Sequence, residues 1–360
     1  MFDAPVLIVP RLDPKPWAGD RLAGLGFARS EGVEPFGEAL LTHGDAIGQL
    51  SSGDTRSLAS LATEAPERYV GARGAAVTGA PDIFPFLVKF IDAAADLSIQ
   101  LHPDDVLARE QGEPTGKTEA WHVLAAEPDA RLYLGLAEDA DPNAFLAAAE
   151  AGDPAAAAML RSIPAEPGTT VVIPAGTVHA LGSGVLIYEI QQPSNTTYRL
   201  YDWGRLDHAG NPRELHHALG RRALVPSRRP EAIAPVPMPT WDGHREMLAA
   251  TRGFALERIV LRAGNVITLP ADPTPQSMTC LGGIFKIISG HEKRVLQRGE
   301  TAVVPAGVVC QIENTMPGVL LRGWTPDLPQ DVIRPARDAG ATDAEIAALA
   351  GELDDISALL

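Results

Sequence analysis

The chain has 360 residues, 45% of them hydrophobic, and a formal net charge of −16. This length allows one large domain or two, and the negative charge disfavours general nucleic-acid binding because phosphates would be repelled. The two cysteines, Cys280 and Cys310, predict no disulfide framework and no cysteine-rich metal site, and no run approaches the about 20 apolar residues of a membrane span. We therefore expect a cytoplasmic protein that binds neither membranes nor nucleic acid.

Short apolar runs separated by Gly and Pro dominate the first half, and this pattern predicts the strands of a barrel or sandwich. The runs lie at 84–92, 97–102, 119–124, 130–136, 169–174 and 184–192. Helical composition interrupts them at 104–110 and at 141–162, where the turn residues at 152–154 should separate two helices. We expect residues 1–225 to form one β domain with helical insertions.

A proline-rich segment divides the chain. Residues 226–241 hold five prolines and predict a linker, because proline fits neither a regular helix nor a central strand. Strand-like runs resume after it, so we expect a second, smaller β domain over 242–326. These runs lie at 255–262, 284–289, 301–305 and 318–324.

The tail, 327–360, is expected to contain an amphipathic helix over 342–360. Thr342 and Glu345 have the spacing of a capping box. Five apolar residues step by three and four positions and form one stripe, which we expect to pack on the body of the same chain. The stripe consists of Ile346, Leu349, Leu353, Ile356 and Leu360.

An internal repeat links the two halves. Residues 168–179 read GTTVVIPAGTVH, and residues 299–310 read GETAVVPAGVVC. Each copy predicts a strand, a Pro-Ala-Gly turn and a second strand, so we expect two related β-barrels. The first copy ends in His179 and the second in Cys310, which we interpret as a small buried residue in a second barrel without metal.

Four polar residues stand inside otherwise apolar strands: Gln100, His102, Glu119 and His179. Alternation places Gln100 and His102 on one face of LSIQLH, and an extended 116–124 places Lys117 beside Glu119. Burying such groups without partners is costly, and two imidazoles with a carboxylate suit either Zn²⁺ or an Fe²⁺ facial triad. The alternative is that each histidine is hydrogen-bonded in the core and that Glu119 forms an ordinary ion pair with Lys117.

Four ordered motifs resemble the type I mannose-6-phosphate isomerase family, in particular its shorter bacterial form. They are FPFLVKFIDAAADLSIQLHPDD (84–105), GKTEAWHVL (116–124), IPAGTVHALGSG (173–184) and YEIQQPSNTTYRLYDWGR (188–205), and KPWAG (15–19) fits as well. The resemblance covers about residues 5–326 and implies a mainly β double cupin, two jelly-roll barrels with helical insertions, to which this sequence adds the C-terminal helix. It also implies interconversion of mannose 6-phosphate and fructose 6-phosphate with one Zn²⁺ per chain.

The resemblance places the zinc ligands on Gln100, His102, Glu119 and His179. It places the family's active-site arginine on Arg199, which could bind a phosphate or the oxygens of an enediolate through its planar fork. The segment GEALLTHGD (37–45) departs from the family, because it lacks the tryptophan that is common there.

Isomerisation through a cis-enediol also needs a base. Lys117 is a candidate for catalysis and substrate binding, since a nearby divalent cation would favour its neutral amine. Glu189, inside the strand LIYEIQQ, is a second candidate, and a zinc-bound water is a third. Among the other histidines, we expect His122 to be packed and His216 with His217 to lie at the surface.

Two other classes of protein also fit these residues. A cupin dioxygenase would hold Fe²⁺ on the same two histidines and carboxylate, and a sugar-binding double cupin would have no catalytic role. The expected partner is a phosphorylated hexose, and we expect a monomer or a weak homodimer.

Overall fold

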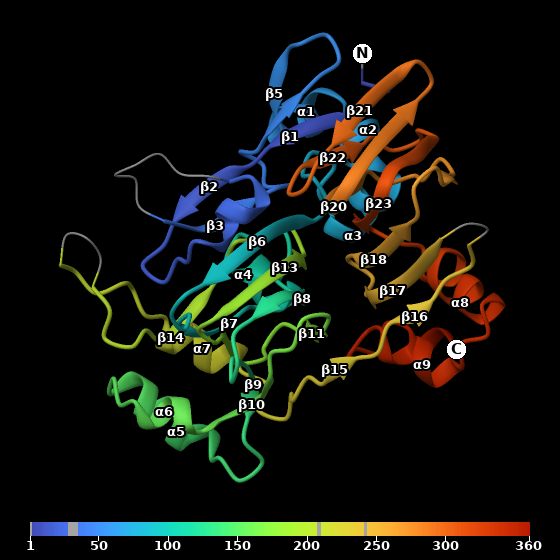
Figure 1. Ribbon diagram of the computed structural model, residues 1–360. Coiled ribbons are helices and arrows are strands. Elements are labelled where there is room, and N and C mark those ends of the chain that lie inside the picture. Colours follow the sequence, from blue (N-terminus) through green and yellow to red (C-terminus); the bar gives the residue numbers. More distant parts are fainter. Residues whose placement is uncertain (1, 28–34, 207–209, 241–242) are drawn as a thin grey trace.

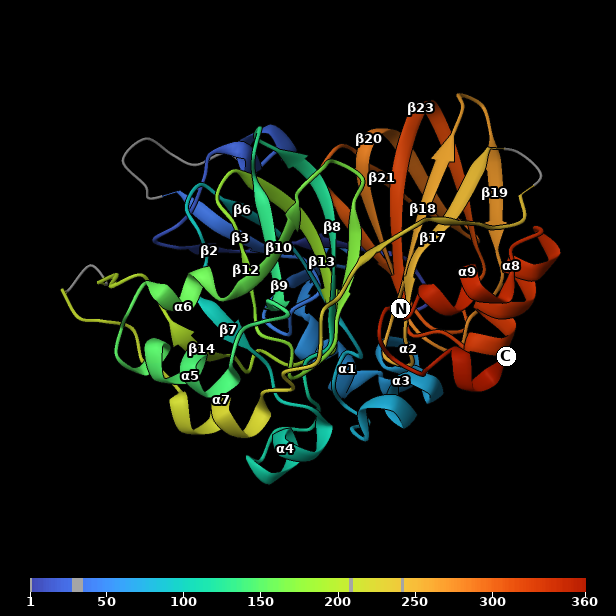
Figure 2. The same ribbon diagram turned by 90° about the horizontal axis from the view of Figure 1, so that it is seen from below.

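The computed structural model describes residues 2–27, 35–206, 210–240 and 243–360. Its three antiparallel sheets form two barrel-like bodies that lie side by side, which confirms the predicted mainly β fold (Figures 1 and 2). Within these ranges, no helix is long and apolar enough to cross a membrane.

Two facing sheets make the first barrel, and apolar side chains from both fill the space between them. Trp121 and Ile187 of the larger sheet belong to the same buried cluster as Leu132 and Leu181 of the smaller one. In order across the seven-stranded sheet, the strands are β15 (Ala232–Ile233), β11 (Thr170–Ile173), β8 (Glu119–Ala126), β13 (Val185–Gln191), β6 (Leu87–Ala93), β3 (Phe36–Leu40) and β2 (Arg11–Pro14). In the five-stranded sheet they are β10 (Leu160–Pro164), β9 (Arg131–Leu136), β12 (His179–Leu181), β7 (Ile99–Leu101) and β14 (Tyr198–Tyr201).

The second barrel is one eleven-stranded sheet around its own apolar core. Its main order is β16 (Val236–Pro237), β17 (His244–Ala250), β18 (Ala255–Leu261), β23 (Cys310–Trp324), β20 (Gln276–Ser289), β22 (Thr301–Val304), β1 (Val6–Val9), β4 (Ile47–Gln49) and β5 (Thr55–Ser57), with β19 (Val266–Leu269) on β23 and β21 (Glu292–Leu296) on β20. The N-terminal strand β1 joins this sheet through β22, so the sheet crosses the boundaries expected from the sequence. The division of the chain into domains stays a prediction.

The proline-rich segment contributes only two strands of two residues each. β15 lies at the edge of the seven-stranded sheet and β16 at the edge of the eleven-stranded sheet. This agrees with the exclusion of proline from central strands.

The helices are short, and those of the first barrel gather at one end of it in Figure 2. Asp104 and Asp141 cap the helices expected near 104–110 and 141–162, and Gly152 separates the second region into two helices, as predicted. The α-helices are α1 (Leu58–Glu64), α2 (Pro66–Tyr69), α3 (Gly71–Thr78), α4 (Asp105–Glu110), α5 (Pro142–Glu150), α6 (Ala155–Ala158), α7 (His217–Ala223), α8 (Arg334–Asp338) and α9 (Asp343–Ala348).

The predicted helix over 342–360 is wrong in length, although its start is confirmed. Thr342 and Glu345 form the capping box, but α9 ends at Ala348. Gly351 takes a φ of 60° and lies so close to Val172 that a Cβ would meet that side chain at 3.0 Å. The chain therefore turns onto the first barrel instead of continuing the helix. The stripe packs within the same chain at Ile346, Leu349 and Ile356, whereas Leu360 is exposed.

The two copies of the repeat have the same local structure. In each copy, one strand (β11 or β22) ends at the Pro-Ala-Gly turn, and the next strand (β12 or β23) follows the turn. Gly176 and Gly307 take similar positive φ values of 84° and 74° in the two turns. Cys310 is buried, as expected, among the apolar residues of the second barrel.

Candidate active site

Pairing across the sheets brings the predicted polar residues to the inside of the first barrel. In the five-stranded sheet, His179 is opposite Gln100, and Gln100 is opposite Arg199. In the seven-stranded sheet, Trp121 is opposite Glu189, and Glu189 is opposite Lys89. Directly opposed residues project from the same face of a sheet, so each row presents its side chains to the interior.

Three of the four predicted metal ligands converge. One candidate ligand atom from each of His102, Glu119 and His179 lies within 4.8 Å of the others, and all three side chains are buried. Glu119 Oε2 lies 3.3 Å from His102 Nε2, and Glu119 Oε1 lies 3.4 Å from His179 Nε2. Among the described residues, no other group of histidine, cysteine and acidic side chains meets this criterion.

The hydrogen bonds of the two histidines fix which nitrogen faces the centre. His102 Nδ1 lies 2.9 Å from the carbonyl of Thr196, and His179 Nδ1 lies 2.9 Å from the carbonyl of Thr177. A carbonyl only accepts, so each Nδ1 carries the proton and each Nε2 presents a lone pair to Glu119. This is the arrangement of metal-binding histidines.

Burial keeps both imidazoles neutral. It lowers the pKa of His179 and, together with Lys117, lowers the pKa of His102 to about 3. Burial alone would raise the pKa of Glu119, but the ammonium of Lys117 lowers it well below its usual range. The centre is therefore one carboxylate between two neutral acceptors.

These acceptors fit a cation. Glu119 Oε1 is buried without a hydrogen-bond partner and faces the lone pair of His179. The ammonium of Lys117 touches Glu119 Oε2 and lies 3.1 Å from His102 Nε2, so it supplies positive charge on one side only. Two imidazole nitrogens and a carboxylate are a donor set that suits a divalent first-row metal.

Gln100 borders this centre. Its Nε2 lies 3.5 Å from His179 Nε2, and its Oε1 accepts a hydrogen bond from Ser98. The amide would have to exchange its oxygen and nitrogen positions to present Oε1 to a metal. Its role as a fourth ligand stays a prediction.

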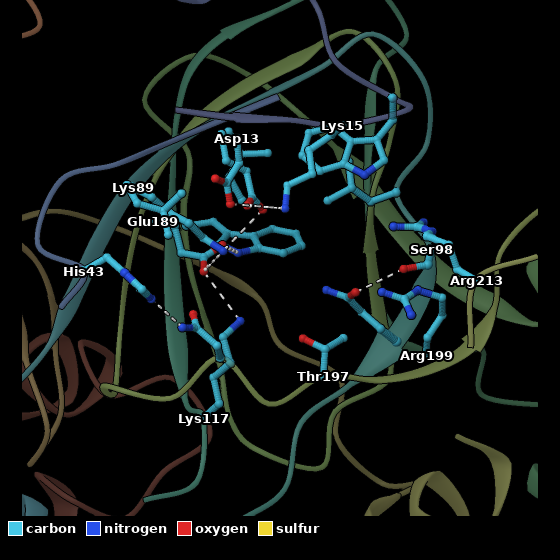
Figure 3. A pocket seen from close by; sticks show the side chains of 18 of the residues that line it. Asp13, Lys15, His43, Lys89, Ser98, Lys117, Glu189, Thr197, Arg199 and Arg213 are labelled. Atoms are coloured by element: carbon cyan, nitrogen blue, oxygen red, sulfur yellow. Dashed lines mark hydrogen bonds and ion pairs between the residues drawn. The ribbon is translucent and has the colours of Figure 1, made fainter. Parts of the chain in front are cut away.

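A strongly charged pocket of about 440 Å³ lies beside the centre (Figure 3). Gln100 and Lys117, which contact His179 and Glu119, form part of its lining. Lys89, Glu189 and Lys117 lie on one side of it, and Ser98, Arg199 and Arg213 on the other.

Glu189 connects the pocket to the group formed by His102, Glu119 and His179, which we call the metal-type centre. Its Oε1 lies 3.1 Å from Lys89 Nζ and 3.5 Å from Lys117 Nζ, and its Oε2 accepts a hydrogen bond from Trp121 Nε1. Burial and the neighbouring Glu119 raise the pKa of Glu189, against the opposing effect of the two lysines. A carboxylate in this environment is a stronger proton acceptor than one in water.

Arg199 has unused hydrogen-bonding capacity. Its Nη1 donates to the carbonyl of Glu214, while its Nε is buried without a partner. Asp202, which could have neutralised it, accepts hydrogen bonds from Nε and Nη2 of Arg213. Among the described residues no carboxylate pairs with Arg199, and its charge is free for a ligand.

The predictions made from the sequence omitted or misplaced several residues of the pocket. Lys15, Glu38 and Lys89 line the pocket; a charged residue inside the apolar run FPFLVKFID was a usable signal for the last of them. His216 was expected at the surface, but it lines the pocket because its backbone N–H donates to Arg199 O. His217 is half-buried.

His122 is packed, as predicted. It is buried on the opposite face of β8, where its Nδ1 lies 2.8 Å from Thr170 Oγ1.

Comparison with known proteins points to one family. No model of a known protein family matches the sequence. A relative from Bacillus subtilis named "putative mannose-6-phosphate isomerase" is 35% identical over 224 residues, which are 61% of this chain and 67% of the relative. The mannose-6-phosphate isomerase of Streptococcus mutans is 29% identical over 84% of this chain and 92% of its own.

The fold agrees with a solved structure. The crystal structure of mannose 6-phosphate isomerase from Bacillus subtilis superposes with a TM-score of 0.76 and 27% identity, over 89% of this chain and 99% of that one. The chain belongs to the mannose-6-phosphate isomerase family.

Proposed function

We propose that this protein is an aldose–ketose isomerase that interconverts D-mannose 6-phosphate and D-fructose 6-phosphate. The observation that carries the proposal is the centre of His102, Glu119 and His179 beside a charged pocket. The relatives named above are mannose-6-phosphate isomerases, and the proposed substrate follows theirs.

The proposed cofactor is one Zn²⁺ per chain, held by His102, Glu119 and His179 with Gln100 as a further ligand. A bound divalent cation would stabilise the negative charge that develops on O1 and O2 of an enediolate. The neutral imidazoles and the unpartnered Glu119 Oε1 support this choice of residues. Iron on the same donor set would be the mark of the dioxygenase alternative.

The proposed reaction moves a proton between C1 and C2 through a cis-enediol, and Glu189 is the favoured base. Its carboxylate is buried, and its pKa is raised, so it can accept a proton from carbon and return it. Trp121 holds one carboxylate oxygen and leaves the other toward the two lysines. Lys117, beside both Glu189 and Glu119, is the alternative base and a further contact for the substrate oxygens.

Arg199 is proposed to bind the phosphate. Its charge, which no described carboxylate pairs with, and its place across the pocket from Glu189 would hold the phosphate at one side while C1 and C2 reach the other (Figure 3). A guanidinium fork matches two phosphate oxygens at once.

The test is a coupled assay with mannose 6-phosphate on the purified protein before chelation, after chelation and after Zn²⁺ is added back. We expect activity, its loss and its return, with zinc found by emission spectroscopy in the untreated protein. Iron without isomerase activity would favour the dioxygenase. Bound zinc and sugar without turnover would favour the sugar-binding double cupin.

Deuterium from solvent tests the mechanism. Product formed in D₂O should carry label at C1 or C2 if a side chain that exchanges with water transfers the proton.

That the protein acts in the cytoplasm, as a monomer or weak homodimer, also remains a proposal, and sedimentation would test its oligomeric state.

A further inference from the structure

Lysines and glutamates alternate along the wall of the pocket from its mouth to the metal-type centre. Lys15 Nζ lies 2.9 Å from Glu38 Oε2, and Glu38 Oε1 lies 3.6 Å from Lys89 Nζ. The row continues from Lys89 through Glu189 to Lys117. Neither the sequence analysis nor the function proposed above gives a role to Lys15, Glu38 or Lys89.

Glu38 is the member that connects the mouth to the interior. It lies on β3, whose Leu40 is opposite Lys89 of β6, so Glu38 and Lys89 are diagonal neighbours on one face of the sheet. Each of its carboxylate oxygens faces a different ammonium, one from Lys15 and one from Lys89. The side chain is only 14% exposed, so it is largely screened from water.

We propose that Glu38 is a positioning residue for the isomerisation: it holds Lys89 against Glu189 and Lys15 at the mouth of the pocket. The inference rests on the proposed function, because Glu189 is the favoured base there. Glu38 itself touches neither the metal-type centre nor, in this assignment, the reacting carbons.

The charges support a fixed arrangement over a mobile one. Burial would raise the pKa of Glu38, but Lys89 and Lys15 lower it to about 2, so the residue stays ionised. Burial would likewise lower the pKa of Lys89, yet Glu189 and Glu38 raise it further than burial lowers it. Both groups therefore keep their charge across the working pH range, and the ion pairs hold the geometry.

The charged groups that face Lys89 determine the effect of removing Glu38. They come from β13, β8, β3 and the segments beside β8 and β2, and are Glu189, Glu119, Glu38, Lys117 and Lys15. Without Glu38, Lys89 keeps one adjacent carboxylate, Glu189, and loses its tie to Lys15. The pKa of Lys89 should then fall, and its side chain should no longer be fixed beside Glu189.

The test compares Glu38→Gln with Glu246→Gln. Glu246 is a matched control, because it also lies on a strand, is 15% exposed and pairs with Arg258, but belongs to the second barrel. For Glu38→Gln we expect kcat to fall by about tenfold or more and KM to change by less than about threefold, since small misplacement near the reacting atoms is costly. The control should keep kcat within about twofold.

Two further measurements separate positioning from general damage. On the alkaline side of the kcat–pH profile, kcat of Glu38→Gln should begin to fall at a lower pH than kcat of the parent, in which Lys89 keeps its charge, because Lys89 loses a neighbouring negative charge in the variant. Labelling of Lys15 by an amine-reactive ester, measured by peptide mass spectrometry, should rise by about threefold or more, because Lys15 loses its closest carboxylate. Neither quantity should change in Glu246→Gln.

The conservative variant Glu38→Asp keeps the charge but is too short to reach both ammonium groups. We expect the alkaline side of its kcat–pH profile to stay near that of the parent and its kcat to fall by about threefold or more. If Glu38→Gln does not fold, this variant decides the question.

The outcomes are distinct. Parent-like kcat in Glu38→Gln, or in Glu38→Asp where the former does not fold, would overturn the proposal. So would unchanged Lys15 labelling in a folded Glu38→Gln. If the parent protein itself does not turn over mannose 6-phosphate, the proposed function fails instead, and the labelling of Lys15 still tests whether Glu38 holds it.

Discussion

Replacement of Glu119 by glutamine should weaken metal binding far more than it disturbs the fold. The carboxylate is fully buried, and its two oxygens lie 3.3 and 3.4 Å from the Nε2 atoms of His102 and His179. Glutamine keeps the shape and removes the charge. Removing one partner of a buried charge pair costs about 3–5 kcal/mol, which corresponds to a loss of about two to three and a half powers of ten in affinity.

The assay is a competition titration with a chromophoric zinc chelator, which reports affinity without any need for turnover. Glu189→Gln is the control, since it removes a carboxylate from the same pocket that does not face either histidine. We expect the control to lose at most about tenfold, as for residues outside the ligand set. If Glu119→Gln bound zinc within tenfold of the parent protein, the three side chains would not be the metal site.

The remaining predictions concern the base, the phosphate, acid stability and the tail. Glu189→Gln should lower kcat by about 10²-fold or more while zinc stays bound, as expected for loss of a general base, and single-turnover kinetics with metal analysis would check this. Arg199→Lys should raise KM for mannose 6-phosphate by about tenfold with a smaller effect on kcat, because one ammonium cannot replace the fork that binds two oxygens. Burial, with a contribution from Arg258, lowers the pKa of His122 from 6.5 to about 4. Between pH 6.5 and about pH 4, the unfolded chain binds a proton at His122 that the folded chain does not bind. The folded state therefore loses stability as the pH falls through this range. His122→Gln should lessen that loss by about 3 kcal/mol in urea titrations. Ile346→Ala should cost about 2–5 kcal/mol in the same assay, since Ile346 is fully buried, whereas Leu360→Ala at the exposed end of the stripe should change stability by less than about 0.5 kcal/mol.

Strand periodicity and the internal repeat singled out the three residues that meet in the metal-type centre, and the family resemblance proposed them as ligands. A polar residue inside an apolar strand must find a partner, and the alternation along 97–102 and 116–124 singled out His102 and Glu119 as such residues. The repeat placed His179 at the start of a strand after a tight turn, which the structure confirms. These are local signals, readable without knowledge of which strands pair.

The rest of the pocket depends on pairing between distant strands, which one sequence does not reveal. Glu38 and Lys89 meet only because β3 pairs with β6, and each residue alone resembles an ordinary surface charge. His216 reaches the pocket through one backbone hydrogen bond to Arg199. The tail was misjudged for a similar reason: its 3.6-residue periodicity continues past Ala348, but the close contact of Gly351 with Val172 ends the helix.

The chemistry of this site depends on the register of β8 as much as on its polar residues. Trp121 lines the pocket and Glu119 belongs to the centre beside it, while Ala120 lies in the apolar core on the other face and His122 is bonded to Thr170 there. A shift of one residue would exchange the two faces and place alanine where the carboxylate is needed. The register is held by antiparallel pairing to β11 and β13 along most of the strand, and His122 adds a side-chain bond that the shifted pairing would lose. A histidine that touches no substrate thus contributes to the site, because it helps to decide which face of the strand the substrate meets.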